Sequence, residues 1–277
     1  MKNGFVLLIT IFLLSIGFVF AIQHNSIPAD VDPSRNNVQI VISEHAVEVS
    51  PGVFSIGTSI DPSTGKVVEG YAIVDYKKEN ARPPWAGGGG GNQENKCYSF
   101  LAKDAKWKTQ EDYLVDLSNN ANLSSASIRS IIADSISEWE FHVYDIFGSE
   151  VVGIVNRTSI GNSANGKNEV IFADVSSNGV IAVTYVWGIF YGSPNGRYLA
   201  EWDQVYDDAD YGWNIDGSLN DMDFENIAQH ELGHSFGLGH PDSSCTEETM
   251  YAYADYGETK KRDLNSGDIA GIKKLYA

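Results

Sequence analysis

The chain has 277 residues, with 19 lysines and arginines against 37 aspartates and glutamates, so its formal net charge is −18. This acidic balance argues against a nucleic-acid-binding protein, which needs a basic surface to neutralise phosphates, and against docking on anionic lipid through a polybasic segment. Hydrophobic residues make up 43% of the chain, which argues against wholesale disorder, and two cysteines are too few for a disulfide-stapled scaffold.

The first predicted element is an apolar run over residues 5–20, which follows Lys2 and ends before Ala21. A basic residue, an apolar stretch and a small residue at the cleavage position are typical of a secretory signal peptide. We therefore expect residues 1–21 to be removed and the rest to be secreted. The run is somewhat longer than a typical signal core, so an uncleaved segment that anchors the protein to the membrane is the alternative. Apart from this segment, we expect no contact with a membrane.

Residues 22–81 predict a small β-rich unit. Alternating and β-branched stretches at 38–42 and 67–74 lie on either side of an Asp-Pro-Ser-Thr-Gly turn sequence at 61–65. This pattern is typical of strands that are joined by hairpins. Sixty residues are a marginal size for an independent core. We expect a propeptide-like unit here, and a targeting module that stays in the mature protein is the alternative.

Residues 82–91 predict a linker, because a Pro-Pro pair is followed there by five consecutive glycines. A phosphate-binding loop would need its glycines at a strand-to-helix junction, which is not the pattern here. The remaining residues, 92–277, are long enough for a core of their own. Because accessible segments are where proteases cut, we expect maturation to remove much of 22–91.

The last part of the chain predicts a mixture of helices and strands. Isoleucines and a tryptophan recur at helical spacing over 127–141, and Ser124 or Ser125 can cap this helix. Residues 170–172 and 180–187 are rich in β-branched and aromatic side chains, which favours strands. Two further helices are expected over 223–236 and 265–276. This order of elements predicts an α+β domain.

Residues from His230 to His240 read His-Glu-Leu-Gly-His-Ser-Phe-Gly-Leu-Gly-His. His230 and His234 lie one helical turn apart on the same face, so they can share a metal ion. Gly237 can adopt the left-handed conformation that ends a helix, after which His240 can return as third ligand. Three imidazoles leave a tetrahedral zinc with one open position, which is the catalytic arrangement. Glu231 lies beside the site and can reach a water there without being a ligand.

This segment is the full metzincin signature, H-E-x-x-H-x-x-G-x-x-H. Met250 resembles the methionine turn that metzincins place beneath their metal. Among metzincins the chain most resembles the matrixins, the family of matrix metalloproteases, through Met250-Tyr251, the segment 268–276 and Lys106-Trp107. The resemblance covers about residues 97–277.

The resemblance implies a metzincin-type catalytic domain, in which a twisted mixed sheet carries an active-site helix and a C-terminal helix. It also implies an extracellular zinc metalloendopeptidase, made as a zymogen, that hydrolyses proteins or peptides. Two departures concern the loop after the motif. Pro241 stands where matrixins usually carry serine, and Ala252 stands where they have the proline of the specificity-pocket wall, so pocket depth is open. His142 is the one further histidine after residue 92, so we expect no additional structural zinc.

The mechanism that follows uses a zinc-activated water. Zinc lowers the pKa of its water and polarises the scissile carbonyl, while Glu231 takes the proton and passes it to the leaving amine. The substrate would extend along an edge strand, for which 180–186 is the candidate; an interior strand is equally open. The alternative function is a metal-binding cell-envelope protein with a structural zinc and no peptidase activity. Glu231 favours the peptidase, because a structural site has no use for it.

Two further features leave alternatives open. Cys97 and Cys245 can form a disulfide, remain free thiols, or use Cys97 as the zinc-binding switch of matrixin zymogens, although the Pro-Arg-Cys-Gly motif of that switch is not present. Between Glu201 and Asp223 there are eight carboxylates and no lysine or arginine. Ca²⁺ takes several oxygen ligands, so this stretch predicts either a calcium site or a solvated acidic loop.

Overall fold

The computed structural model describes residues 39–80 and 97–277, and all of these belong to one compact unit. The predicted signal segment, 1–21, and the predicted linker, 82–91, lie outside the described residues. Within the described ranges, no helix combines the length and the apolar character that crossing a membrane requires.

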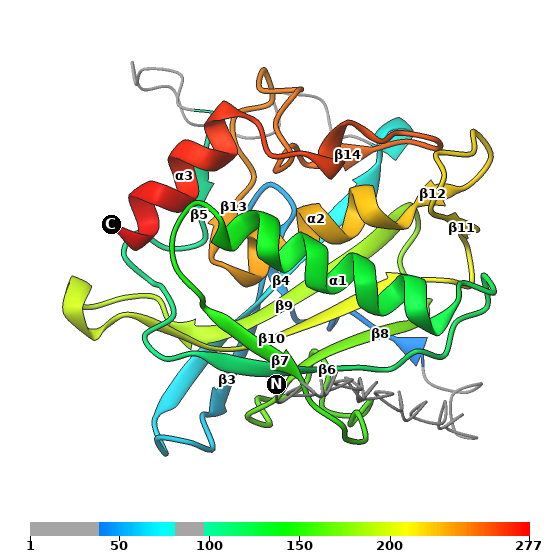
Figure 1. Ribbon diagram of the computed structural model, residues 1–277. Helices are drawn as coiled ribbons and strands as arrows, with labels where there is room; N and C mark the ends of the chain where they lie inside the picture. The colour runs from blue at the N-terminus through cyan, green and yellow to red at the C-terminus, as the bar shows by residue number, and fades with distance from the viewer. Residues whose placement is uncertain (1–38, 81–96) are drawn as a thin grey trace, which may run out of the picture. The chain divides into compact units, whose positions relative to one another are not determined.

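A mixed β-sheet of ten strands forms the centre of the fold (Figure 1). Eight strands follow one another in the order β2-β3-β4-β9-β10-β8-β6-β7, while β1 pairs with β8 and β14 pairs with β4. The pairs from β2 to β10 are antiparallel, and the other pairs of this sheet are parallel. The strands span Gln39–Ile40 (β1), Val47–Ser50 (β2), Val53–Ile60 (β3), Val67–Lys77 (β4), Glu111–Val115 (β6), Phe147–Glu150 (β7), Asn168–Val175 (β8), Val180–Ile189 (β9), Tyr198–Asp207 (β10) and Tyr253–Ala254 (β14).

Two short ladders and three 3₁₀ turns complete the strand-rich part. β5 pairs antiparallel with β13, and β11 pairs parallel with β12. These elements span Ser99–Phe100 (β5), Trp213–Asn214 (β11), Met222–Asp223 (β12), Leu238–Gly239 (β13), Lys78–Asn80 (η2), Pro194–Gly196 (η4) and Lys260–Arg262 (η5).

The three α-helices are Ser125–Glu140 (α1), Phe224–Ser235 (α2) and Ser266–Tyr276 (α3). α1 and α2 each begin at a side chain that accepts from a free backbone N–H of the first turn, as helix N-termini require; these caps are Ser124 and Asp223. At the start of α3, Glu248 accepts from the free N–H groups of Gly267 and Asp268. The helices agree with the predicted ranges to within two residues at each end. In Figure 1, α1 and α2 lie over the same face of the sheet.

Buried side chains pack against both faces of the sheet. One cluster lies between the sheet and the helices and is rich in aromatic rings, such as Trp139 of α1, whose ring centroid is 6.1 Å from that of Phe236. A second, mainly aliphatic cluster includes Val183 of β9 and Val205 of β10. This mixed sheet with packed helices confirms the predicted α+β fold.

The strands of residues 39–80 belong to this same sheet instead of forming a sheet of their own. β4 pairs with β9 from Glu69 opposite Gly188 to Tyr76 opposite Val180. β9 is therefore interior, because β10 covers its other edge, and the open question about 180–186 is answered in favour of an interior strand. The sequence pattern could not tell these two cases apart, since a buried strand reads alike whichever segment pairs with it.

Candidate metal centre

Helix α2 carries the first two histidines of the motif and the glutamate between them. His230, Glu231 and His234 have no solvent exposure. The helix begins at Asp223, whose carboxylate accepts a hydrogen bond from the Asn226 N–H at 3.0 Å. This cap fixes where the helix starts and therefore which side chains of the motif face the sheet.

Gly237 ends the helical segment and redirects the chain. Its φ is +100°, a backbone conformation that residues with a side chain rarely adopt. A Cβ on this residue would also lie 3.2 Å from the carbonyl oxygen of Ala105 and 3.1 Å from Leu199 Cδ1. Conformation and space therefore both favour glycine here. The chain then runs through β13 and presents His240.

The three imidazoles converge through their Nε2 atoms. His234 Nε2 lies 3.1 Å from His230 Nε2 and 3.1 Å from His240 Nε2. His230 Nδ1 donates to the Thr249 carbonyl oxygen at 2.6 Å, and His234 Nδ1 donates to the Leu238 carbonyl oxygen at 2.9 Å. Because a carbonyl oxygen only accepts, the proton of each of these two rings sits on Nδ1.

Two nitrogen lone pairs therefore face each other across 3.1 Å, an arrangement that repels unless a cation lies between them. Carbonyl acceptors at Nδ1 are also the partners that orient metal-binding histidines. Three neutral imidazoles are a donor set that suits zinc. The residues present therefore fit a metal ion, and His230, His234 and His240 form a group that could hold one.

The electrostatics of the histidines agree with this geometry. Burial lowers the pKa of His234 to about 3, and it lowers the pKa of His230 and of His240 well below the usual range. Lys261 acts in the same direction on all three rings, because its ammonium opposes a second positive charge. The rings are therefore neutral at neutral pH, which is the form that binds metals.

The Glu231 carboxylate lies beside the first of these rings, within 4.8 Å of a potential ligand atom of His230. Oε2 accepts a hydrogen bond from the Thr184 hydroxyl on β9 at 2.5 Å, while Oε1 has no hydrogen-bond partner among the described residues. Burial raises the pKa of Glu231 well above its ordinary value, and the nearby Asp75 adds to that rise. One oxygen is thus held and the other is free to take a proton.

Met250 lies directly beneath the helix. A Cβ on Gly233, between the two helical histidines, would overlap the Met250 sulfur. The turn that carries Met250 is fastened to α3, because Asp268 accepts from the N–H groups of Thr249 at 2.7 Å and Met250 at 3.1 Å. Thr249 supplies the carbonyl oxygen that orients His230, so Asp268 positions the histidine indirectly, through the Thr249 backbone.

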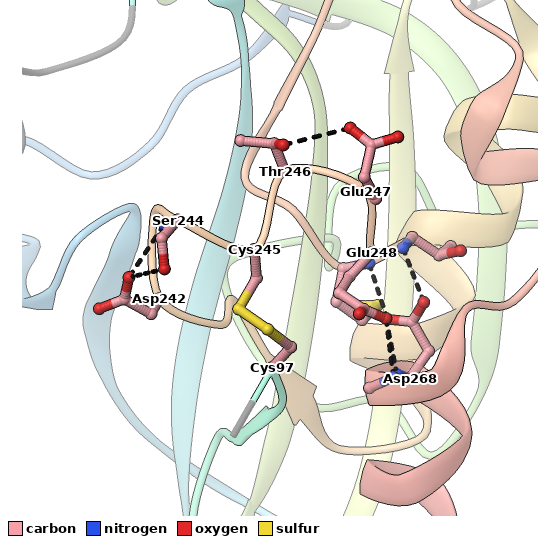
Figure 2. The surroundings of a disulfide bond; sticks show 11 residues. Cys97, Asp242, Ser244, Cys245, Thr246, Glu247, Glu248 and Asp268 are labelled. Carbon is pink, nitrogen blue, oxygen red and sulfur yellow. Dashed lines mark hydrogen bonds between the residues drawn. A yellow bond between two sulfur atoms is a disulfide. The ribbon is translucent and has the colours of Figure 1, made fainter. Parts of the chain in front are cut away.

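A disulfide holds the segment after the third histidine (Figure 2). Cys97 and Cys245 are joined, with their Cα atoms 5.5 Å apart. Near it, Glu248 accepts from the N–H groups of Gly267 and Asp268 at the start of α3. Cys97 in this disulfide has no thiolate to offer a metal. The bond closes a separation of 148 residues and ties β5 to the loop beyond His240.

The acidic stretch from Glu201 to Asp223 is less solvated than a surface loop. Most of its carboxylates are buried, namely those of Glu201, Asp203, Asp207, Asp208 and Asp223. Among the described residues, two groups of three or more potential ligands lie close enough for one ion, and neither includes a carboxylate of this stretch. Calcium binding there stays a prediction.

Sequence reasoning missed several residues that complete the site. Thr184, Thr249, Asp268 and Lys261 all reach it from other elements, and nothing in their spacing relates them to the motif. Asp75 is a partial exception, because a lone acid within the apolar run Tyr-Ala-Ile-Val-Asp-Tyr is unusual in a buried strand. Its carboxylate lies within 4.8 Å of potential ligand atoms of His230 and Glu231.

Comparison with known proteins gives one family. The family model described as matrixin matches residues 106–277. Metalloendoproteinase 1 of Glycine max is 28% identical over 187 residues, which are 65% of this chain and 55% of that protein. Matrilysin of Felis catus is 27% identical over 171 residues, 62% of this chain and 60% of that protein. Metalloendoproteinase 2-MMP of Arabidopsis thaliana is 41% identical over 76 residues, 25% of this chain and 19% of that protein. The chain thus spans less than two thirds of the length of these relatives.

Proposed function

Because this chain belongs to the matrixin family, we propose that it is a zinc-dependent metalloendopeptidase that hydrolyses peptide bonds in proteins or peptides. His230, His234 and His240 would hold the zinc, and Glu231 would be the general base. The observation that carries the proposal is the pair of Nε2 lone pairs that face each other across 3.1 Å. Relatives named metalloendoproteinase and matrilysin support the reaction class.

When bound, zinc supplies a Lewis acid that polarises the scissile carbonyl and lowers the pKa of water. The protein's own part of the reaction falls to Glu231. Its free Oε1 takes the proton of the attacking water and later delivers that proton to the leaving amine. Thr184 keeps Oε2 in place by its hydrogen bond, so Oε1 remains the oxygen that can accept a proton.

A cell-envelope protein with a purely structural zinc is the competing function. Burying a carboxylate that has one oxygen without a partner costs stability, and a group of this kind is expected where the carboxylate serves the reaction. Glu231 meets that description, which favours the peptidase. The two functions differ in one observable, because the structural protein would bind zinc without cleaving anything.

The cellular part of the proposal rests on sequence. We propose that residues 1–21 direct secretion, with an uncleaved membrane anchor as the alternative, and that the enzyme is made as a zymogen from which residues 22–91 are largely removed. N-terminal sequencing of the secreted protein tests both steps. An active protein that retains residue 22 indefinitely would contradict removal.

The reaction itself is tested on purified secreted protein. We expect one zinc per chain by metal analysis, and cleavage of a denatured protein that stops with a chelator and returns when zinc is restored. Zinc at one per chain without any cleavage, in protein whose N-terminus has been processed, would instead support the structural alternative.

A further inference from the structure

The loop over residues 241–248 joins two parts of the candidate metal centre. It follows His240 directly and leads into Thr249, whose carbonyl oxygen accepts the hydrogen bond from Nδ1 of His230 at 2.6 Å. None of its residues, all of which the structure describes, belongs to a helix or a strand. Backbone ladders therefore do not fix this loop, and its two ends are held by contacts with other segments.

The hydrogen bonds near the third ligand stay within the loop. The Asp242 carboxylate accepts from the N–H of Ser244 at 2.9 Å and from its hydroxyl at 2.7 Å (Figure 2). The Asp242 carbonyl oxygen accepts from the N–H of Cys245 at 2.9 Å. These bonds order a turn, but they do not attach it to another segment. At the far end of the loop the attachments are hydrogen bonds, such as those that Glu248 accepts from the start of α3.

The disulfide attaches the middle of the loop to a different segment. Cys245 is buried, and its partner Cys97 lies shortly before β5. β5 pairs with β13, where Phe100 stands opposite Leu238. The Leu238 carbonyl oxygen orients His234, and the chain leaves β13 directly into the third ligand. The segment that begins at Cys97 thus contacts the strand before that ligand and, through the disulfide, the loop after it.

Close packing also fixes Cys97 itself. A Cβ on Gly267, in the first turn of α3, would overlap the carbonyl oxygen of Cys97 and lie 2.7 Å from Cδ of Glu248. The backbone at Cys97 therefore rests against α3 and the far end of the loop, at a place where only glycine fits. The bond to Cys245 links the loop to a segment that the rest of the fold already holds.

The bond removes conformational freedom from both segments that it joins. Without it, the loop next to His240 can open locally while the hydrogen bonds at its far end persist. A ligand that moves must be ordered when the metal binds, and the free energy of that ordering lowers the affinity. Chain ends also fray unless they are tied down, and the proposed removal of residues 22–91 leaves Cys97 close to such an end.

We propose that the disulfide between Cys97 and Cys245 positions the metal ligands. The oxidised chain then binds zinc tightly, and the reduced chain binds it about 10–100-fold more weakly, as when other groups that orient metal ligands are lost. Both cysteines are positioning residues, because they act through the loop and β5. The peptidase is thereby confined to an oxidising compartment, where disulfides form and persist. This inference rests on the proposed function, which makes zinc the bound metal.

Formation of the bond is a two-electron oxidation. The thiols of Cys97 and Cys245 lose two protons and two electrons, and a disulfide oxidant such as oxidised glutathione takes up both and becomes two thiols. A water-soluble phosphine reverses the step. Its phosphorus gives two electrons to the S–S bond, while one water supplies the two thiol protons and the oxygen of the phosphine oxide. A phosphine is used because a dithiol would also chelate zinc.

The test uses the full chain with Glu231→Gln, so that self-cleavage does not complicate the readouts. This chain is compared in its oxidised form, after reduction with both thiols counted, and with Cys97→Ser and Cys245→Ser together, which leaves no thiolate to bind the metal. The control is Val205→Ala, which makes a cavity in the second cluster and lowers stability at a position outside the loop. Circular dichroism confirms that each protein is folded during the measurements.

Three measurements follow, and none of them needs hydrolysis. Competition with a chromophoric chelator gives the zinc dissociation constant, which should rise about 10–100-fold on reduction and in the serine pair, but less than about twofold in the control. Hydrogen exchange over residues 238–249 of the metal-free protein should become at least about tenfold faster, since local opening sets protection. With Co²⁺ at saturation in place of zinc, the visible spectrum should change on reduction, because ligand geometry sets the cobalt bands. Oxidised glutathione should restore all three readouts in the reduced chain.

The outcomes separate this inference from the proposed function. Equal zinc dissociation constants in the oxidised, reduced and serine-substituted chains would overturn the inference and leave the peptidase in place. An equal loss of affinity in Val205→Ala would also overturn it, because the effect would then follow general stability. If zinc binding depends on the disulfide as expected, but oxidised protein with native Glu231, a processed N-terminus and bound zinc cleaves no protein, the proposed function fails while the disulfide still positions the ligands.

Discussion

Asp268→Asn should destabilise the protein through the turn that carries Met250. Oδ2 of Asp268 accepts from the N–H groups of Thr249 and Asn265, and Oδ1 accepts from that of Met250. An asparagine has one acceptor oxygen, so even in its better orientation its NH₂ group meets the Met250 N–H. One buried N–H without a partner costs about 1–3 kcal/mol, and the two remaining bonds lose their charge assistance.

We therefore expect a loss of about 3 kcal/mol, which corresponds to a fall of about 1 M in the urea midpoint for a protein of this size. Asp263→Asn is the control, because it makes the same change at an exposed residue of the same segment. Urea unfolding of zinc-loaded protein, followed by tryptophan fluorescence, measures both. Midpoints within about 0.2 M of each other would refute the role given to Asp268.

Three further changes test separate parts of the site. Thr184→Val should lower kcat about tenfold and shift the acidic limb of the pH profile upward. The Thr184 hydrogen bond lowers the pKa of Glu231, so its removal raises that pKa, and an unshifted profile would argue against that bond. Glu201→Gln should raise stability at pH 8 and flatten its pH dependence. Burial raises the pKa of Glu201 to about 7 from the 4.5 of the unfolded chain, so the stability that this carboxyl contributes is complete below about pH 4.5 and lost as pH rises through 7. Urea midpoints at pH 5 and pH 8 that respond equally to the substitution would contradict it. His234→Ala should abolish stoichiometric zinc, because two histidines rarely hold the ion, and metal analysis that still shows one zinc per chain would refute the ligand set.

Local features of this fold could be predicted because their causes lie within a few residues. The cap at Ser124, the helical spacing of the isoleucines and the turn at Gly237 each depend on short stretches of chain. The helix over 223–236 is found at Phe224–Ser235 for the same reason. The ligand spacing of the motif is also local, so His230, His234 and His240 could be grouped before their Nε2 atoms were seen to meet.

Pairing between distant segments could not be predicted in the same way. Residues 67–74 predict a strand, but nothing in them indicates that β9 is the neighbour, because backbone ladders carry no partner-specific signal. The change in composition after residue 81 predicts a separate unit for 22–81. In the structure, β4 is instead buried on both faces within the large sheet. Asp75 and Lys261 reach the site through such pairings and through η5, and spacing along the chain does not reveal them.

The most direct test of the catalytic assignment is Glu231→Gln in secreted protein with its N-terminus processed in the same way as the unaltered enzyme. The amide has the shape of the acid but takes no proton from water, and general-base catalysis is worth about 10²–10⁴-fold. We predict one zinc per chain, an unchanged urea midpoint or a higher one, and loss of nearly all cleavage of a denatured protein. Cleavage at an unchanged rate, with zinc in place, would show that Glu231 is not the base.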